Sequence, residues 1–346
     1  MNFSIDIEPT NRCNAKCTFC PRDQTPHQGL MTPAIFEQAL ARSVEFRAAA
    51  LEHTGDNTEI NLCGLGEPLL NRHTADWVAA VRREGFDCGL STNGALLDVA
   101  RGDALLDAGL VTININVGTI GDEYEQVYQL PFEKVRDNVV RFAESAAGRC
   151  VVNLVLVDYK DDPTHVEAMK SYWRDHGIDS FLPFEIQNRG GALYVDHMQF
   201  EEMGETREAR DRMTRGPVGP VCAAPILFLF VGYDGKYYLC CSDWKKEVAF
   251  GDVFDRSMVS LVEDKLRHVI ERTAVCSTCN LDPTNRVAAA IASARAGTGS
   301  EEAIESVIAE VALWSEVTFQ KSERLAPGVT DRVTSTARRR IPVVGR

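Results

Sequence analysis

Three cysteines near the start of the chain constrain its fold and chemistry more than any other feature. Cys13, Cys17 and Cys20 lie within eight positions in the order CxxxCxxC. The preceding residues, 3–8 (FSIDIE), alternate apolar with polar side chains and predict a strand, and Pro9 breaks this pattern. The cysteines should therefore lie on a loop just past a strand end. Three thiolates on one loop can hold a soft metal ion, or an iron-sulfur cluster with one iron left open to a small chelating molecule.

This spacing resembles that of the radical S-adenosylmethionine (radical SAM) superfamily, as does the aromatic Phe19 directly before the third cysteine. The resemblance implies that the three cysteines bind a 4Fe-4S cluster whose open iron binds the amino and carboxylate groups of SAM. An electron from the cluster then cleaves SAM, and the resulting 5′-deoxyadenosyl radical takes a hydrogen atom from the substrate. A zinc-binding loop is the alternative interpretation of the same three thiolates.

Composition is typical of a globular protein with one large and one smaller domain. The 346 residues are 45% hydrophobic and 25% charged, and no apolar run approaches a membrane span. We see no secretory signal, so we expect a cytoplasmic protein without membrane contact, in which clustered cysteines favour metal sites over disulfides. The formal net charge of −13 argues against a nucleic-acid partner, which needs a basic face, and weakly favours a cationic substrate.

The first 190 residues alternate short apolar runs with amphipathic stretches. The predicted strands are residues 3–7, 59–62, 87–91, 111–117, 150–157 and 181–186. The predicted helices are residues 33–51, 72–84, 99–108, 132–147 and 164–176. This alternation predicts an α/β fold with a parallel sheet and right-handed crossovers, curled into a partial, TIM-like (β/α)6 barrel. The loops at the C-terminal ends of its strands should meet and build the active site.

The loop after the second strand reads CGLGEP over residues 63–68. Its two glycines let the backbone approach a ligand closely, and Glu67 supplies an acceptor for an ammonium group. The segment is similar to the GGEP motif of the radical SAM family, although Leu65 occupies the place of the second glycine. The resemblance implies that SAM binds against Gly64, Gly66, Glu67 and Pro68. A plain turn is the alternative.

Polar residues also end the next three strands. Ser91, Thr92 and Asn93 stand where the family commonly has a TNG sequence lining the SAM pocket, and a polar turn is the alternative. Asn116 stands where many members have a serine that touches the SAM ribose, and Asn153 is a weaker candidate of the same kind. Amides within apolar strands need hydrogen-bond partners when they are buried.

The sixth strand ends in the sequence EIQNRGG. Alternation places Glu185 and Gln187 on one face, from which both reach the substrate if that face is the barrel interior. Arg189 can bind a carboxylate of SAM or substrate with its planar guanidinium. A surface salt bridge before a Gly-Gly turn is the alternative for Arg189.

A second cysteine set follows residue 220. A cysteine precedes a hairpin with an Asp-Gly turn, a Cys-Cys pair ends it, and a CxxC follows a helix predicted at 257–272. The layout resembles the Twitch domain, the shortened form of the SPASM domain, which holds one auxiliary 4Fe-4S cluster. The resemblance implies four ligands for this cluster: Cys222, Cys240, Cys276 and Cys279. A zinc ribbon is the alternative interpretation. Cys241 could replace Cys240, but neighbouring strand residues face opposite sides and cannot both bind equally.

These features predict four regions. They are a radical SAM barrel over 1–190, a linker over 191–219 with a helix near 201–213, a Twitch-like domain over 220–283 and a helical extension over 284–346. The extension should contain helices at 286–295 and 301–324, and we expect no chemistry from it.

The resemblance implies an enzyme that uses SAM, two 4Fe-4S clusters and an external one-electron reductant of the flavodoxin or ferredoxin type. Relatives with one Twitch-type cluster include aminocyclitol dehydrogenases and sugar epimerases of antibiotic pathways. We therefore expect hydrogen abstraction from a carbinol carbon of a small polar sugar or aminocyclitol. Oxidation of the resulting radical gives a ketone, whereas hydrogen return from a thiol, Cys241 or Cys63, gives an epimer. The alternatives are a SPASM-type peptide maturase, disfavoured because the chain starts at strand one without an N-terminal recognition domain, and a non-catalytic metal-binding module.

Overall fold

The computed structural model describes residues 3–54, 58–160, 162–193, 221–272, 275–326 and 328. The predicted linker falls outside the described residues from position 194 onward, and with it the helix predicted near 201–213. The arginine-rich end of the chain also lies outside them.

A single nine-stranded sheet runs through both predicted domains, in the order β6-β5-β4-β3-β2-β1-β7-β8-β9. Strands β1 to β7 are parallel to their neighbours, and β8 and β9 add antiparallel strands at one edge. The strands are β1 (Phe3–Ile7), β2 (Thr58–Leu62), β3 (Asp87–Thr92), β4 (Thr112–Asn116), β5 (Val151–Asp158), β6 (Phe181–Glu185), β7 (Phe228–Val231), β8 (Lys236–Tyr238) and β9 (Ala249–Asp252).

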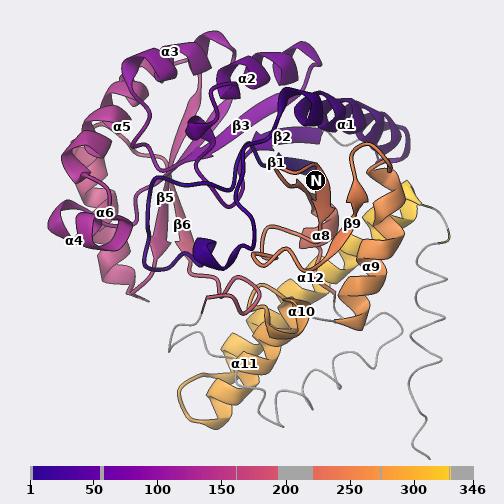
Figure 1. The fold of residues 1–346 in the computed structure, drawn as a ribbon. Helices are drawn as coiled ribbons and strands as arrows, with labels where there is room; N and C mark the ends of the chain where they lie inside the picture. The colour runs from indigo at the N-terminus through magenta and orange to yellow at the C-terminus, as the bar shows by residue number, and fades with distance from the viewer. Residues whose placement is uncertain are drawn as a thin grey trace, which may run out of the picture.

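Helices connect successive parallel strands and cover the outer face of the sheet (Figure 1). The covering helices are α1 (Pro33–Thr54), α2 (Thr74–Arg83), α3 (Val99–Asp107), α4 (Gly121–Tyr128), α5 (Phe132–Ala146) and α6 (Pro163–Asp175). The predicted α/β architecture is confirmed. Helix α4 was not predicted, because its sequence GDEYEQVY is short and carries only three buried side chains.

Strand alternation separates the core from an inner polar face. In β1, Phe3, Ile5 and Ile7 are buried in the hydrophobic core that the outer helices cover. The intervening Ser4 and Asp6 line the interior cavity described below. The same division holds in β2, where Ile60 and Leu62 join the core. One face of the strands therefore stabilises the fold, and the other is available for polar chemistry.

The second cysteine region is not detached from the barrel. Strand β7 pairs in parallel with β1, with Ser4 opposite Phe228 and Ile7 opposite Val231. The β7–β8 hairpin thus covers the edge of β1, which would otherwise present unpaired backbone groups. This pairing joins residues more than 220 positions apart and could not be derived from local sequence patterns.

The remaining helices gather on one side of this sheet edge. They are α8 (Ala224–Leu227), α9 (Val262–Glu271), α10 (Val275–Thr278), α11 (Pro283–Arg295) and α12 (Glu301–Leu325). Helix α12 passes beside α8 and α9 and reaches the start of β1, where Lys321 lies 4.6 Å from the centre of the Phe3 ring (Figure 1). No helix in the described ranges is long and apolar enough to cross a membrane.

A buried ion pair links β1 to the added strands. Glu8 directly follows β1, its side chain is 0% exposed, and it lies 2.6 Å from the Lys246 ammonium, whose side chain is 5% exposed. The Glu8 carboxylate also accepts hydrogen bonds from the backbone of Leu65 at 2.9 Å and Tyr233 at 3.1 Å. One carboxylate therefore holds three segments together: the strand end, the loop after β2 and the β7–β8 turn.

Removing either partner of this pair should destabilise the protein strongly. We expect Glu8→Gln or Lys246→Met to lower the free energy of unfolding of the apoprotein by about 3–5 kcal/mol, because each leaves a charge buried without its partner. Urea denaturation followed by circular dichroism measures this.

The matched control is Asp107→Asn, which removes the exposed ion pair between Asp107 and Arg149. Its effect should stay within about 1 kcal/mol. Equal effects of Glu8→Gln and Asp107→Asn would show that the buried pair does not hold the two parts together.

Candidate functional site

The three-cysteine loop follows β1, as predicted, and docks onto the C-terminal end of α4. The backbone N–H groups of Lys16 and Thr18 donate to the carbonyls of Tyr128 and Val127, at 3.2 and 2.9 Å. Phe19 packs edge-on against Tyr128 and stacks on Tyr159. The unpredicted α4 therefore sets the position of the loop that carries the cysteines.

Asn93 and Glu67 hold the loop from the other side. The Asn93 amide lies 3.7 Å from the Cys13 sulfur and donates to Asn14 at 2.9 Å. Glu67 is 1% exposed and accepts from the Asn93 N–H at 2.8 Å, the Thr92 hydroxyl at 2.8 Å and the Leu69 N–H at 3.0 Å. Burial raises the pKa of Glu67 to about 7, and these three donors oppose the increase. The carboxylate anchors the turn that contacts Cys13.

The two glycines of the CGLGEP loop are required by close packing within the protein. A Cβ atom on Gly66 would lie 2.4 Å from the carbonyl oxygen of Arg12, and one on Gly64 would lie 2.5 Å from the Glu8 side chain. The loop after β2 therefore presses against the chain that leads into the cysteine loop. Pro68 begins a short 3₁₀ helix, Pro68–Leu70, for which Glu67 is the N-cap.

The second cysteine set comes together from four places in the chain. Cys222, Cys240, Cys276 and Cys279 are all buried. Burial raises the pKa of Cys240, and Cys241, Cys279 and Cys276 raise it further. Burial also raises the pKa of Cys222, with smaller contributions from Asp282, Cys279 and Cys240. The second cysteine set therefore lies close together, with Cys241 nearby.

Cys240 and Cys241 face different surroundings. Cys241 lines the interior cavity together with Cys63, whereas Cys240 packs with Cys276 and Val275 in a small hydrophobic cluster. The geometry therefore groups Cys240, rather than Cys241, with the other three buried cysteines. Both cysteines lie in the turn that follows β8, which ends at Tyr238.

The first helix of the C-terminal extension supports this cysteine cluster. The Asn285 amide donates to the carbonyls of Cys276 at 3.0 Å and Cys279 at 2.9 Å, which fixes the CxxC turn. The extension therefore supports the structure of the second cysteine set, and its lack of chemistry stays a prediction. The loop after β6 is also bonded to this region. The backbone N–H of Asn188 donates to the Asn280 side chain at 2.9 Å, and the backbone N–H of Asn280 donates to the Asn188 side chain at 3.1 Å.

Both cysteine sets suit iron-sulfur clusters in their chemistry. A single zinc ion needs thiolate sulfurs about 2.3 Å from one point, and among the described residues no three metal-binding side chains are arranged in that way. A cluster spreads its thiolates over several irons, so its ligands stand further apart. The first set offers three partly exposed thiols, whereas the second offers four buried ones.

A cavity of about 560 Å³ fills the interior of the sheet, and Cys63, Arg189 and Cys241 are among the residues that line it. Its described lining is rich in hydroxyl and amide groups from the inner faces of β1 to β5, and includes Ser4, Asn61, Ser91, Thr112, Asn114 and Asn153. Phe184 and Phe228 add aromatic surface, and Trp314 of α12 lies at its wall. The volume is in the range of small-molecule sites.

The charged residues among the described lining are Asp6, Glu59, Asp87 and Arg189. Asp6 is 8% exposed, accepts from the Ser4 hydroxyl at 2.9 Å and is bonded to the Cys63 thiol. Burial raises the pKa of Asp6 to about 6. Sequence analysis did not identify Asp6. The signal for it was its alternation with Ile5 and Ile7, which places its side chain on the opposite face of a strand that is buried on both faces.

The sixth strand departs from its expected orientation. Leu182, Phe184 and Gln187 line the cavity, whereas Glu185 is exposed and is not among the lining residues. The predicted alternation fails because β6 ends at Glu185, and the chain then turns to bury Ile186 against Val157. Glu185 is therefore not available at the cavity.

Arg189 lies between the two cysteine regions. It lines the cavity, sits over the Trp244 ring at 5.4 Å, and its charge lowers the pKa of both Cys20 and Cys241 against the effect of burial. Its positive φ of 51° turns the chain toward Gly190. The alternative for Arg189 was a surface salt bridge, and the described part of the chain shows no salt bridge of its side chain.

The two asparagines proposed for the SAM ribose differ in their surroundings. The Asn116 amide makes one long hydrogen bond, to the Thr92 carbonyl at 3.4 Å. Asn153 donates to Asn114 at 3.1 Å and accepts from Ser180 at 2.6 Å, so both ends of its amide are engaged. Asn116 is thus the freer of the two to bind a ligand.

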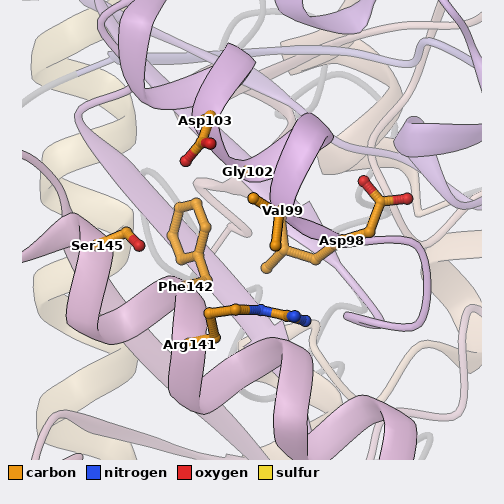
Figure 2. Close-up of a pocket in the computed structure, with 8 residues that line it drawn as sticks. Asp98, Val99, Gly102, Asp103, Arg141, Phe142 and Ser145 are labelled. Atoms are coloured by element: carbon orange, nitrogen blue, oxygen red, sulfur yellow. The ribbon is translucent and has the colours of Figure 1, made fainter.

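A second, smaller hollow of about 170 Å³ lies on the outer helical layer between α3 and α5 (Figure 2). Phe142 of α5 points toward Gly102 and Val99 of α3, with Asp98, Asp103 and Arg141 around it. Its lining contains no cysteine, and it is formed by outward-facing residues of helices that cover the sheet. We place no part of the site there.

Comparison with known proteins agrees with this geometry. The Radical SAM superfamily model matches residues 7–171, and an iron-sulfur cluster-binding domain model, SPASM, matches residues 222–280. A probable GTP 3′,8-cyclase of Methanocaldococcus jannaschii is 25% identical over 61% of this chain and 68% of its own length. A GTP 3′,8-cyclase of Staphylococcus carnosus is 31% identical over 58% of this chain and 59% of its own. The chain thus spans between about half and two thirds of these relatives.

Solved structures share the fold. BtrN in complex with AdoMet and 2-DOIA matches with a TM-score of 0.51 and 17% identity, over 81% of this chain and 93% of its own. Native anSMEcpe with bound AdoMet matches with a TM-score of 0.58 and 15% identity, over 96% of this chain and 99% of its own. The two domain models together imply SAM and two iron-sulfur clusters as cofactors, and an external reductant. The chain therefore belongs to the radical SAM superfamily and carries a SPASM-type iron-sulfur cluster-binding domain behind its radical SAM domain.

Proposed function

We propose that this enzyme removes a carbinol hydrogen from an amino-bearing sugar or aminocyclitol and yields a ketone or an epimer. The observation that carries the proposal is the polar cavity in the interior of the sheet. Its lining combines hydroxyls and amides with three carboxylates and one guanidinium. Such a lining suits a small polyol that carries a positive charge.

The charge of this cavity distinguishes the proposal from the activity named for the sequence relatives. GTP carries a triphosphate, and proteins bind such groups with several arginines or lysines. Arg189 is the single cation among the described lining residues, which include three carboxylates. One of these carboxylates, Asp87, pairs with Arg82. A polyanion would be repelled here, whereas an ammonium group would be attracted.

The cysteines supply the cofactor sites in this proposal. Cys13, Cys17 and Cys20 hold the SAM-binding cluster, and Cys222, Cys240, Cys276 and Cys279 hold the second cluster. Gly64, Gly66, Glu67 and the turn Ser91–Asn93 shape the SAM pocket, with Asn116 toward the ribose. When bound, SAM and the first cluster supply the radical that removes the hydrogen atom.

The electron balance separates the two outcomes. Loss of one hydrogen atom from a carbinol leaves a carbon radical, which forms a ketone by losing one proton and one electron. The second cluster would supply an acceptor for this electron and would return it to the first cluster or to the external reductant, so that SAM would be the net oxidant. Alternatively, a thiol returns a hydrogen atom from the opposite face, and the resulting thiyl radical then needs one electron and one proton to reset.

This chain's own residues have defined tasks in either route. Asp6 is placed to bind the ammonium or to take the carbinol proton, because a carboxyl with a pKa of about 6 is ionised at neutral pH and can still accept a proton. Cys241 and Cys63 both line the cavity and are the candidate hydrogen donors. Burial raises the pKa of Cys63, which keeps it as the S–H form that hydrogen transfer requires.

Cluster assignment can be tested by iron analysis. Reconstituted wild-type protein should contain about eight irons per chain and Cys240→Ser about four, because loss of one buried ligand removes the second cluster. Cys241→Ser is the matched control and should retain about eight. Equal losses in both variants would show that the cavity-facing thiol is also a ligand.

Substrate class can be tested by following 5′-deoxyadenosine with SAM, dithionite and a panel of aminocyclitols, aminosugars, neutral sugars and GTP. We expect amino-bearing polyols to stimulate its formation and GTP to have no effect. Stimulation by GTP alone would overturn the proposal in favour of the activity named for the relatives.

The two outcomes can be separated in deuterated water. A product lighter by two hydrogens identifies dehydrogenation, and one of unchanged composition with one deuterium identifies epimerisation. In the second case Cys241→Ala should still form 5′-deoxyadenosine but lose the epimer. If product forms unchanged in both Cys241→Ala and Cys63→Ala, neither thiol is the donor.

The role of Asp6 predicts a pH dependence. Turnover should fall as the pH is lowered through about 6, because protonation of Asp6 removes the negative charge and the proton acceptor. Asp6→Asn should lower turnover on the order of 10²-fold and abolish this acidic limb. Asp103→Asn, on the outer hollow, is the control and should leave the profile unchanged. An acidic limb that persists in Asp6→Asn would assign it to another group.

A further inference from the structure

Lys265 is a buried cation with no task in the proposed reaction. It lies on α9 and is 0% exposed. Its ammonium donates hydrogen bonds to the carbonyl oxygens of Tyr238 and Leu239, both at 2.9 Å. These residues directly precede Cys240, so the charge is fixed beside the backbone that presents this cysteine.

The position is costly unless negative charge balances it. Burying an ammonium without a counter-charge costs several kcal/mol, and these hydrogen bonds go to neutral carbonyls. Burial lowers the pKa of Lys265 to about 8, while Cys240, Asp6 and Cys241 act in the opposite direction. The groups that favour its charged form are therefore one cysteine of the second cluster site, Cys240, and two groups of the cavity, Asp6 and Cys241.

A cluster held by four thiolates adds counter-charge to that of Asp6. Such a cluster is negatively charged overall, and its charge becomes more negative when it gains an electron. A fixed positive charge nearby stabilises the reduced form more than the oxidised form, and a dry site strengthens the effect. Net charge and the groups around the cluster set its reduction potential over a wide range.

We propose that the Lys265 ammonium is the charge partner of the second cluster and raises its reduction potential. Acceptance of the substrate electron by this cluster rests on the proposed function, whereas the effect on the potential requires only that the cluster is bound. Lys265 does not touch the substrate. It acts by placing a positive charge beside the second cluster. The proposal also explains why a lysine is tolerated at a fully buried helix position.

The test is a redox titration of reconstituted holoenzyme, with both clusters followed by electron paramagnetic resonance. Lys265→Gln keeps an amide that can donate to the same carbonyls but removes the charge. We expect it to lower the midpoint potential of the second cluster and leave that of the SAM-binding cluster unchanged. Lys265→Arg, which keeps the charge, should stay close to wild type.

The matched control is Lys245→Gln, which removes an exposed lysine from the same region. Solvent screens an exposed charge, so both potentials should stay at their wild-type values.

Each result decides the question. An unchanged second-cluster potential in Lys265→Gln overturns the proposal. If Lys265→Gln fails to bind the second cluster while Lys265→Arg binds it, the charge is needed for assembly, which supports the pairing. Loss of the cluster in both variants overturns it, because packing would then explain the lysine. A lowered potential in an enzyme that makes no ketone would leave this inference standing and remove the dehydrogenase route.

Discussion

The buried contact between Glu8 and Lys246 is the interaction on which the arrangement of both cysteine regions depends. Glu8 directly follows β1, the strand that leads into the first cysteine loop. Lys246 follows the β7–β8 hairpin of the second cysteine region. The same carboxylate holds the loop after β2, whose Glu67 anchors the turn at Cys13. Because Gly64 lies against the Glu8 side chain, a larger residue there would disturb all of these contacts at once.

Charge inside the molecule is distributed more selectively than the overall acidity suggests. The chain has a formal charge of −13, and the described cavity wall shares that sign. Cations are nevertheless placed at particular points: Lys246 against Glu8, Arg189 between the two cysteine regions, and Lys265 behind Cys240. Each lies where a negative group is buried or where electrons are expected to arrive. Position, rather than the total count, gives these cations their effect.

The fold class and the cysteine motifs could be predicted from the sequence because they depend on local patterns. The alternation of strands and helices, the cysteine spacings and the CGLGEP loop all act over short distances, and the fold prediction was confirmed. The pairing of β7 with β1, the docking of the cysteine loop on α4, and the support of the CxxC turn by Asn285 depend on contacts between distant segments. Glu185 shows the limit of alternation, because a strand that ends one residue early changes which side chains face inward.

The spacing of the cysteines along the chain also bears on how the protein is made. The first three lie within eight positions, but Glu67, Asn93 and α4 position their loop, so this site can be complete once residue 128 has been made. The other four are spread from Cys222 to Cys279, and the turn that carries the last two is held by Asn285. Because β7 must pair with β1 and α11 must be present, the second site is complete only near the end of synthesis. The segments that build the first cysteine site therefore leave the ribosome before those that build the second.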